Sequence, residues 1–174
     1  MSVKAIILIT WAMFFISCNK TEEYLTPEKK EEIKTEVISS IEKHVEDIIS
    51  QDYNNVIQFY NKNDYVIYGD GSYWGDYSAI DDIWKTWLPK WQAITKWTAE
   101  NHKVQVYSRN EAVDIMVWAH ERIEEDGDTT RAYGSFVWGM QRFPDGWKSV
   151  YRSLLHIGGC GRSIRCGFGC PPIL

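Results

Sequence analysis

The side chains best suited to chemistry lie on one alternating segment, residues 112–124, which reads AVDIMVWAHERIE. Alternation of this kind predicts a strand with two distinct faces. One face mixes apolar and titratable side chains, as a ligand pocket requires, and carries Asp114, Met116, Trp118, His120 and Arg122. His120 would be the acid or base of such a pocket, because the unperturbed pKa of histidine lies near neutrality. The alternative is a half-buried histidine bonded to a neighbour, since no nucleophile or second carboxylate is placed beside it.

Tryptophan is abundant, with nine residues in the chain, and eight of them follow residue 17. Trp84, Trp87 and Trp91 have helical spacing, which favours packing in a core or at a rim. The alternative is a stacking platform for a sugar or another planar ligand. Trp74, close to Gly71 and Gly75, is predicted at the lip of a pocket.

Two helices are predicted ahead of the strands. Thr26-Pro27-Glu28 has the pattern of a helix start, with a capping hydroxyl, a proline at the first position and an acid in the first turn. This helix runs to about Ser50, and its apolar face carries Ile33, Val37, Ile41, Val45, Ile48 and Ile49. A second, short helix is expected from Asp52, with Val56, Ile57 and Tyr60 on its apolar side.

After these helices the spacing of apolar residues changes to the alternation typical of a sheet. Residues 65–68 predict a strand, 69–71 a turn, and 76–88 a further helix limited by Pro89. Four long strands follow, at about 96–108, 112–124, 130–142 and 147–157, with hairpin connections SRNEA, EEDGDT and FPDGW. Helices gathered before an antiparallel meander indicate an α+β fold, with the helices on one face of a curved sheet.

The last strand is predicted to place Trp147, Tyr151, Ser153 and Leu155 on one face and Val150, Arg152, Leu154 and His156 on the other. On this basis Tyr151 lines the pocket, and Arg152 points to the opposite face. That face is partly apolar, so we expect it to be covered. A second copy of the chain, in a homodimer, is the expected cover on this ground together with the family resemblance given below.

The N-terminus has the pattern of an export signal. Lys4 precedes the apolar run AIILITWAMFFI, which ends at Ser17 and Cys18 and is too short for a comfortable transmembrane helix. The residues FISC resemble the lipobox of bacterial lipoproteins, in which the cysteine is lipidated. The predicted division is therefore a signal peptide at 1–17, a tether at 18–25 and a protein on the bacterial cell envelope. The alternative is a plain signal peptide with an incidental cysteine.

Residues 159–174 form a tail rich in glycine and cysteine that we expect to lie beyond the fold. Its cysteines, Cys160, Cys166 and Cys170, allow one disulfide and one remaining thiol. A zinc site with His156 as fourth ligand is a weaker alternative. The net charge of −5 gives no broad electrostatic case for nucleic acid. No metal motif, phosphate-binding loop or nucleophile elbow is present, so no cofactor is expected.

Three segments occur in a fixed order: DYNNVIQFY, which leads into the first strand, then GDYSAIDDIWKTWL, and then the final hairpin YGSFVWGMQRFPDGWKSVYRSLLH. This order resembles the nuclear transport factor 2-like superfamily, which includes SnoaL-like and ketosteroid isomerase-like proteins. The resemblance implies one cystatin-like domain at 26–158, a cone in which a strongly bent sheet wraps round the first helix and leaves a pocket. It also implies an isomerase base at the end of the first strand. That position falls on Gly69, and the adjacent Asp70 lies in a Gly-Asp-Gly turn, where a solvated aspartate is the better interpretation.

Whether the chain is an enzyme stays open, because fold does not fix function and the supporting acids of the isomerases have no counterpart. The favoured hypothesis is a lipid-anchored module that binds a small hydrophobic or aromatic ligand, or a protein partner, in a pocket lined by Tyr68, Trp74, Met116, Trp118 and Tyr151. The alternatives are an isomerase, dehydratase or hydrolase that uses His120 with Asp70, Tyr68 or Tyr151, and an assembly module acting through the sheet face.

Overall fold

The computed structural model describes residues 24–62, 67–69 and 74–158, with the backbone alone at 67–69, 74 and 155–158. Several predicted features lie outside the described residues, namely Cys18, Asp70 and the cysteines of the tail. The side chains of Tyr68, Trp74 and His156 lie outside them as well. No helix of the described ranges is long and apolar enough to cross a membrane.

The long helix α2 (Pro27–Ile49) forms as the sequence predicts. The Thr26 hydroxyl caps it by accepting the backbone N–H of Lys29 at 3.3 Å. Its buried face consists of Ile33, Val37, Ile41, His44 and Ile48. After a left-handed residue at Gln51, the chain continues into α3 (Tyr53–Gln58), capped by Asp52, and later α4 (Tyr77–Trp87), capped by Asp76. A short 3₁₀ helix, η1 (Leu88–Lys90), then turns the chain into the sheet.

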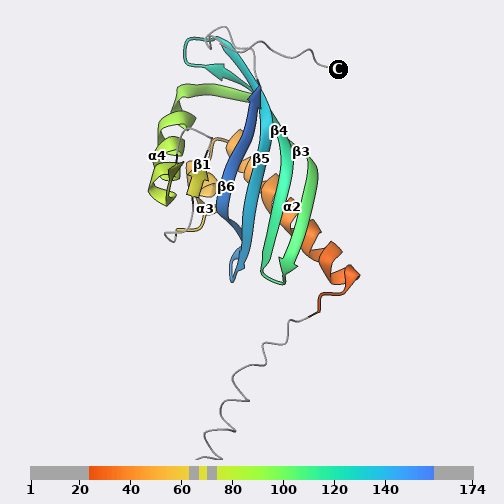
Figure 1. Cartoon of the computed structure of the whole chain (residues 1–174). Helices are drawn as coiled ribbons and strands as arrows, with labels where there is room; N and C mark the ends of the chain where they lie inside the picture. The colour runs from red at the N-terminus through yellow and green to blue at the C-terminus, as the bar shows by residue number, and fades with distance from the viewer. Residues whose placement is uncertain (1–23, 63–66, 70–73, 159–174) are drawn as a thin grey trace, which may run out of the picture.

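One sheet of six strands has the order β2-β1-β6-β5-β4-β3. The strands are β1 (Ile67–Gly69), β2 (Trp74–Gly75), β3 (Trp91–Ser108), β4 (Glu111–Glu124), β5 (Thr129–Phe143) and β6 (Gly146–Gly158). Among these strands β1 and β6 pair in parallel and the other neighbours are antiparallel, and an isolated parallel bridge joins Tyr60 to Ser149. Figure 1 shows the four long strands side by side, with α2 crossing behind them and α4 beyond β6 and β1. The predicted α+β architecture, a curved sheet around the N-terminal helix, is confirmed.

The core lies between α2 and the face of the sheet that turns toward it, called the inner face below. Asp114, Met116, Trp118 and His120 of β4 all point inward and are buried, whereas Ile115 and Val117 point outward. The predicted division of this strand into two faces therefore matches the structure.

The last strand differs from its prediction because its pairing with β5 shifts register at two places, and one of these shifts lies next to the predicted site residue Tyr151. The partners of β6 run from Gly139–Tyr151 directly to Met140–Ser149, so Val150 is an extra residue and the alternation is reset there. Tyr151 consequently lies on the outer face, where a Cβ added to Gly139 would come within 2.9 Å of the Tyr151 Cβ. Arg152 and Leu154 lie on the inner face together with Trp147.

Candidate ligand-binding cavity

A cavity of about 110 Å³ opens between α4 and the inner face of the sheet. Most of its wall is aromatic or aliphatic, and its polar members are one histidine and two arginines. The lining residues are Ile80, Ile83, Trp84, Trp87, Trp91, Trp97, Trp118, His120, Arg122, Arg152 and Leu154.

The predicted site residues are only partly brought together. Trp118 and His120 line the cavity. Met116 lies in the hydrophobic core instead, and Tyr151 lies on the outer face. The side chains of Tyr68 and Trp74 lie outside the described residues, as does Asp70.

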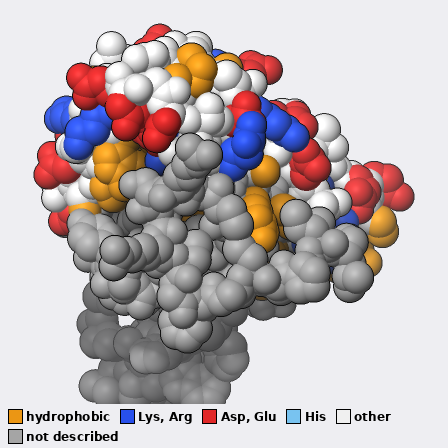
Figure 2. All heavy atoms as spheres, turned by 90° about the horizontal axis from the view of Figure 1, so that it is seen from above, with side chains coloured by type: hydrophobic (Ala, Val, Ile, Leu, Met, Phe, Trp, Pro, Cys, Tyr) orange, Lys and Arg blue, Asp and Glu red, His pale blue; other side chains and the backbone are white. Residues whose placement is uncertain are grey.

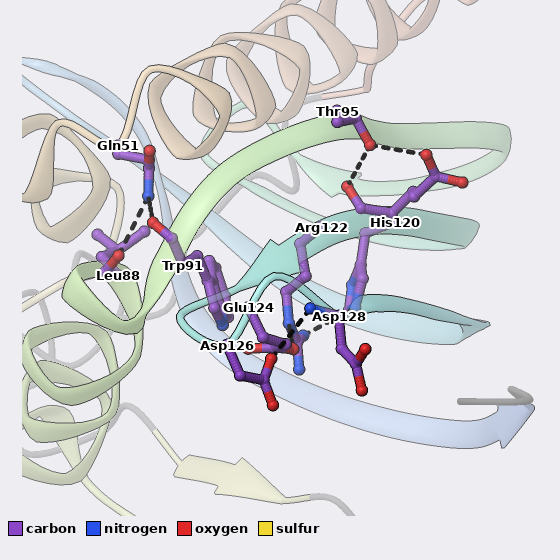
Figure 3. Close-up of polar contacts among 10 residues, drawn as sticks. Gln51, Leu88, Trp91, Thr95, His120, Arg122, Glu124, Asp126 and Asp128 are labelled. Atoms are coloured by element: carbon purple, nitrogen blue, oxygen red, sulfur yellow. Dashed lines mark hydrogen bonds and ion pairs between the residues drawn. The ribbon is translucent and has the colours of Figure 1, made fainter. Parts of the chain in front are cut away.

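The corner between α4 and β3 positions the tryptophan-rich wall. Pro89 occurs where α4 gives way to the 3₁₀ turn. The side-chain amide of Gln51 donates to the backbone carbonyls of Leu88, at 3.1 Å, and Trp91, at 2.8 Å (Figure 3). These two long-range hydrogen bonds fix the start of β3, where Trp91 lies, against the end of α2.

The packing role predicted for the tryptophans, in a core or at a rim, matches the structure. Trp84 and Trp91 are buried and meet edge to face at 6.4 Å between ring centroids. Trp97 stacks on the His120 ring at 4.7 Å. Trp87 remains 46% exposed and forms the rim. The ring faces of this cluster form a wall that suits a flat ligand.

His120 is held by an arginine on its own strand. Arg122 NH1 approaches His120 Nε2 at 2.8 Å, Arg122 Nε donates to Glu124 at 2.6 Å, and the guanidinium lies over the Trp91 ring (Figure 3). Burial, and then the Arg122 charge, lower the pKa of His120 to about 4. The imidazole is therefore neutral near pH 7, its Nε2 accepts from Arg122, and its proton lies on Nδ1. A group so poorly basic, with its acceptor nitrogen occupied, is badly suited to general acid–base work.

A second polar cluster, unforeseen from the sequence, lies behind the cavity wall. The Tyr60 hydroxyl oxygen accepts from Trp84 Nε1 at 3.2 Å and from Arg152 NH1 at 3.1 Å, and lies 3.3 Å from His44 Nε2. With two N–H groups pointing at its oxygen, the hydroxyl donates its own proton to His44. Burial and the nearby Arg152 charge hold the pKa of His44 well below its usual range. The sequence feature that could have revealed this cluster is His44, a polar residue within the apolar stripe of α2.

Asp114 has a structural role away from the cavity. Its carboxylate is fully buried and accepts the backbone N–H of Lys103 at 3.1 Å, and its other oxygen lies 2.6 Å from His102 Nδ1. These bonds close the irregular stretch of β3 between Glu100 and Lys103, where Asn101 is left-handed. The carboxylate raises the pKa of His102. Within the described ranges, no three His, Cys, Asp or Glu side chains are placed to share a metal ion.

The depressed pKa of His120 predicts a loss of stability in acid. The unfolded chain binds a proton near pH 6.5 and the folded chain only near pH 4, so His120 lowers the free energy of unfolding as pH falls through this window. The loss should reach about 3 kcal/mol at pH 4 and vanish above pH 6.5. Urea unfolding at several pH values should therefore give His120→Gln a shallower decline than the wild type.

His102→Gln is the matched control, because the pKa of His102 moves in the other direction. Its contribution is complete below pH 6.5 and fades as pH rises through the folded pKa. The His102 variant should therefore differ from the wild type in how stability changes above pH 6.5. Parallel declines of the wild type and His120→Gln between pH 6.5 and 4 would contradict the assignment.

Comparisons with known proteins give a consistent fold. No protein-family model matches the sequence, and no curated protein matches it. Among solved structures, the chain is similar to a nuclear transport factor 2-like superfamily protein from Salmonella enterica (19% identity, 80% of this chain and 99% of that chain, TM-score 0.61). It is also similar to a candidate scytalone dehydratase from Novosphingobium aromaticivorans (9%, 83% and 99%, 0.70) and a hexachlorocyclohexane dehydrochlorinase from Novosphingobium barchaimii (8%, 85% and 100%, 0.61). The chain therefore has the nuclear transport factor 2-like fold.

Proposed function

We propose that this chain binds a small planar aromatic molecule in the tryptophan-lined cavity and does not transform it. The observation that carries the proposal is the wall itself, in which five tryptophans from α4, β3 and β4 surround the space. Concave, mostly apolar sites with a few polar groups are typical of small-molecule binding. An engineered cavity of roughly 150 Å³ accommodates benzene, so a space of about 110 Å³ suits a ligand with one ring.

The state of His120 favours binding over catalysis. Its acceptor nitrogen is occupied by Arg122, and Tyr151, one of its expected partners, lies on the other side of the sheet. Two of the similar structures are described as a dehydrochlorinase and a candidate dehydratase, so an enzyme is the alternative. That alternative requires a base other than His120 as it stands in the structure.

We also propose that the protein is anchored to a bacterial membrane through Cys18. The proposal rests on Lys4, the apolar run that follows it and the FISC sequence, with a polar stretch between Cys18 and α2. A domain tethered in this way would present its cavity outside the cytoplasm.

A homodimer through the outer face of the sheet is the third part of the proposal. Ile115, Val117 and Tyr133 are 44%, 40% and 39% exposed on neighbouring strands β4 and β5. In the view from above, by contrast, acidic and basic side chains are interspersed over the described surface (Figure 2). A second copy of the chain that covers this apolar sheet face would remove it from water and so stabilise the dimer.

Trp97→Leu should weaken the binding of single-ring aromatic compounds about five- to tenfold, because an aromatic contact contributes about 1 kcal/mol beyond area burial. Thermal-shift screening with phenol, indole and benzoate, followed by calorimetry of any hit, measures the loss. Tyr107→Ala is the control, since Tyr107 is exposed and away from the cavity. A flat response of the wild type to every single-ring compound would sink the proposal.

Cys18→Ala should move the protein from the membrane fraction to the soluble fraction of the bacterial cell, and mass spectrometry should detect a lipid on Cys18 of the wild type. Cys160→Ala, which removes a cysteine of the tail, should leave the distribution unchanged. Equal membrane retention of the wild type and Cys18→Ala would refute lipidation.

Val117→Glu should convert a dimer to a monomer in sedimentation velocity, because it buries an unpaired charge in the proposed contact. Asn110→Glu places the same charge in the exposed turn between β3 and β4 and should leave the mass unchanged. A wild-type protein that sediments as a monomer at micromolar concentration would rule out the dimer.

A further inference from the structure

Two exposed tyrosines lie together at one end of the domain. Tyr24, just before α2, is 82% exposed, and Tyr107, near the end of β3, is 65% exposed. Among the described residues these are the two most exposed of the large hydrophobic side chains. Both border a groove of about 590 Å³ between the start of α2 and the turn that joins β3 to β4, and Leu25 and Val106 line the same groove.

This end of the domain is also the end that the proposed lipid anchor holds. The start of α2 and the turn between β3 and β4 lie at the lower end of the domain in Figure 1, and α4 lies at its upper left. Tyr24 follows Cys18 by six residues, a length of chain that spans at most about 20 Å. A domain of this size is roughly 35 Å across. A lipid on Cys18 would therefore bring the end with the two tyrosines to the bilayer and keep the opposite end away from it.

Tyrosine suits the chemistry of a membrane surface. Its ring is apolar and its hydroxyl is polar, so it lies favourably at the level of the lipid headgroups. Two rings alone would bind a bilayer weakly. The short tether, however, makes this contact intramolecular, with an effective concentration on the order of millimolar, so a weak contact is enough.

The charges at this end largely offset one another. On the first turns of α2, Lys29 pairs with Glu32 and Lys34 with Glu31, each at 2.7 Å. Residues 19–23 of the tether carry one lysine and two glutamates. Attraction to anionic lipid is therefore small, and a contact with the membrane would depend on the rings and change little with salt.

We infer that the domain docks on the surface of the membrane that carries its anchor, through the rings of Tyr24 and Tyr107. The inference rests on the anchor part of the proposed function, because the tether supplies the effective concentration. It goes beyond the anchor, since a lipid on Cys18 leaves the domain free to move, whereas the docked rings fix its orientation.

The docked orientation directs the cavity toward water. The strand β4 runs from Glu111, at the turn beside the tyrosines, to Trp118 and His120 in the cavity wall. That length of strand spans about 25 to 30 Å. The ligand of the cavity would then arrive from the aqueous phase and not from the bilayer.

The test measures how fast hydroxyl radicals oxidise each aromatic side chain, by mass spectrometry of the full-length protein. Wild-type lipoprotein in phosphatidylcholine vesicles is compared with Cys18→Ala, which lacks the lipid, in solution. We expect oxidation of Tyr24 and Tyr107 to fall about threefold or more in the vesicles, because a tethered contact is occupied most of the time. Trp87, at the rim of the cavity, should be oxidised equally in both samples.

The variant Tyr107→Ala tests whether the rings cause this protection. In vesicles, its Tyr24 should regain most of the oxidation seen in solution, because one ring holds the domain less firmly than two. Tyr133→Ala, which removes an exposed tyrosine of β5, is the matched control and should leave Tyr24 protected. Added salt or phosphatidylglycerol should leave the wild-type pattern unchanged, and circular dichroism establishes that each variant is folded.

The outcomes separate docking from anchoring. If the lipid is found on Cys18 but both tyrosines are oxidised as fast in vesicles as in solution, docking is overturned and the anchor stands. Full protection of Tyr24 in folded Tyr107→Ala would also overturn docking, because the tether alone would then account for it. Protection of Tyr133 in place of Tyr24 and Tyr107 would overturn it in favour of contact through the sheet face. If no lipid is found on Cys18, the anchor fails, and the inference fails with it.

Discussion

The Tyr60 hydroxyl is the interaction on which the rest of the inner structure depends. It joins three separate parts of the chain, His44 of α2, Trp84 of α4 and Arg152 of β6. Each of these side chains is too polar to be buried at low cost without a partner, and the shared oxygen and its proton satisfy one group on each. The network therefore keeps α4 at a fixed place relative to the sheet, and the space between them is the cavity.

The cavity follows from how large side chains fill this space. The long helix α2 packs its aliphatic stripe against the inner face, and aromatic rings fill the region near α4 that the stripe does not cover. Rings of this size meet at 4.7 to 6.5 Å between centroids and cannot close every gap, so a hollow remains between them. Burial and the Arg122 charge lower the pKa of His120 at the edge of this hollow, so its imidazole is neutral near pH 7.

Much of this arrangement could be predicted from local patterns in the sequence. Capping residues and helical spacing placed α2, and strict alternation placed the inner face of β4 with Trp118 and His120. Local patterns could not reveal that Val150 is an extra residue, because its place depends on pairing with β5. For this reason Tyr151 and Arg152 were assigned to each other's faces. The hydrogen bonds of Tyr60, and the hydrogen bond from Gln51 to the Trp91 carbonyl, join residues far apart in sequence. The periodicity of apolar residues carries no information about such contacts.

The extra residue in β6 means that the chemistry of the cavity is set by the length of the strand as much as by its composition. Deletion of one residue between Trp147 and Arg152 would keep nearly every side chain yet exchange the two faces of the segment beyond it. Tyr151 and Ser153 would then face the helices, and a wall that carries a permanent cation would become one of hydroxyl groups. The same strand thus carries a second, uncharged set of wall residues one position out of phase. An insertion or deletion here would change the charge of the cavity wall in a single step, where point substitutions would need several.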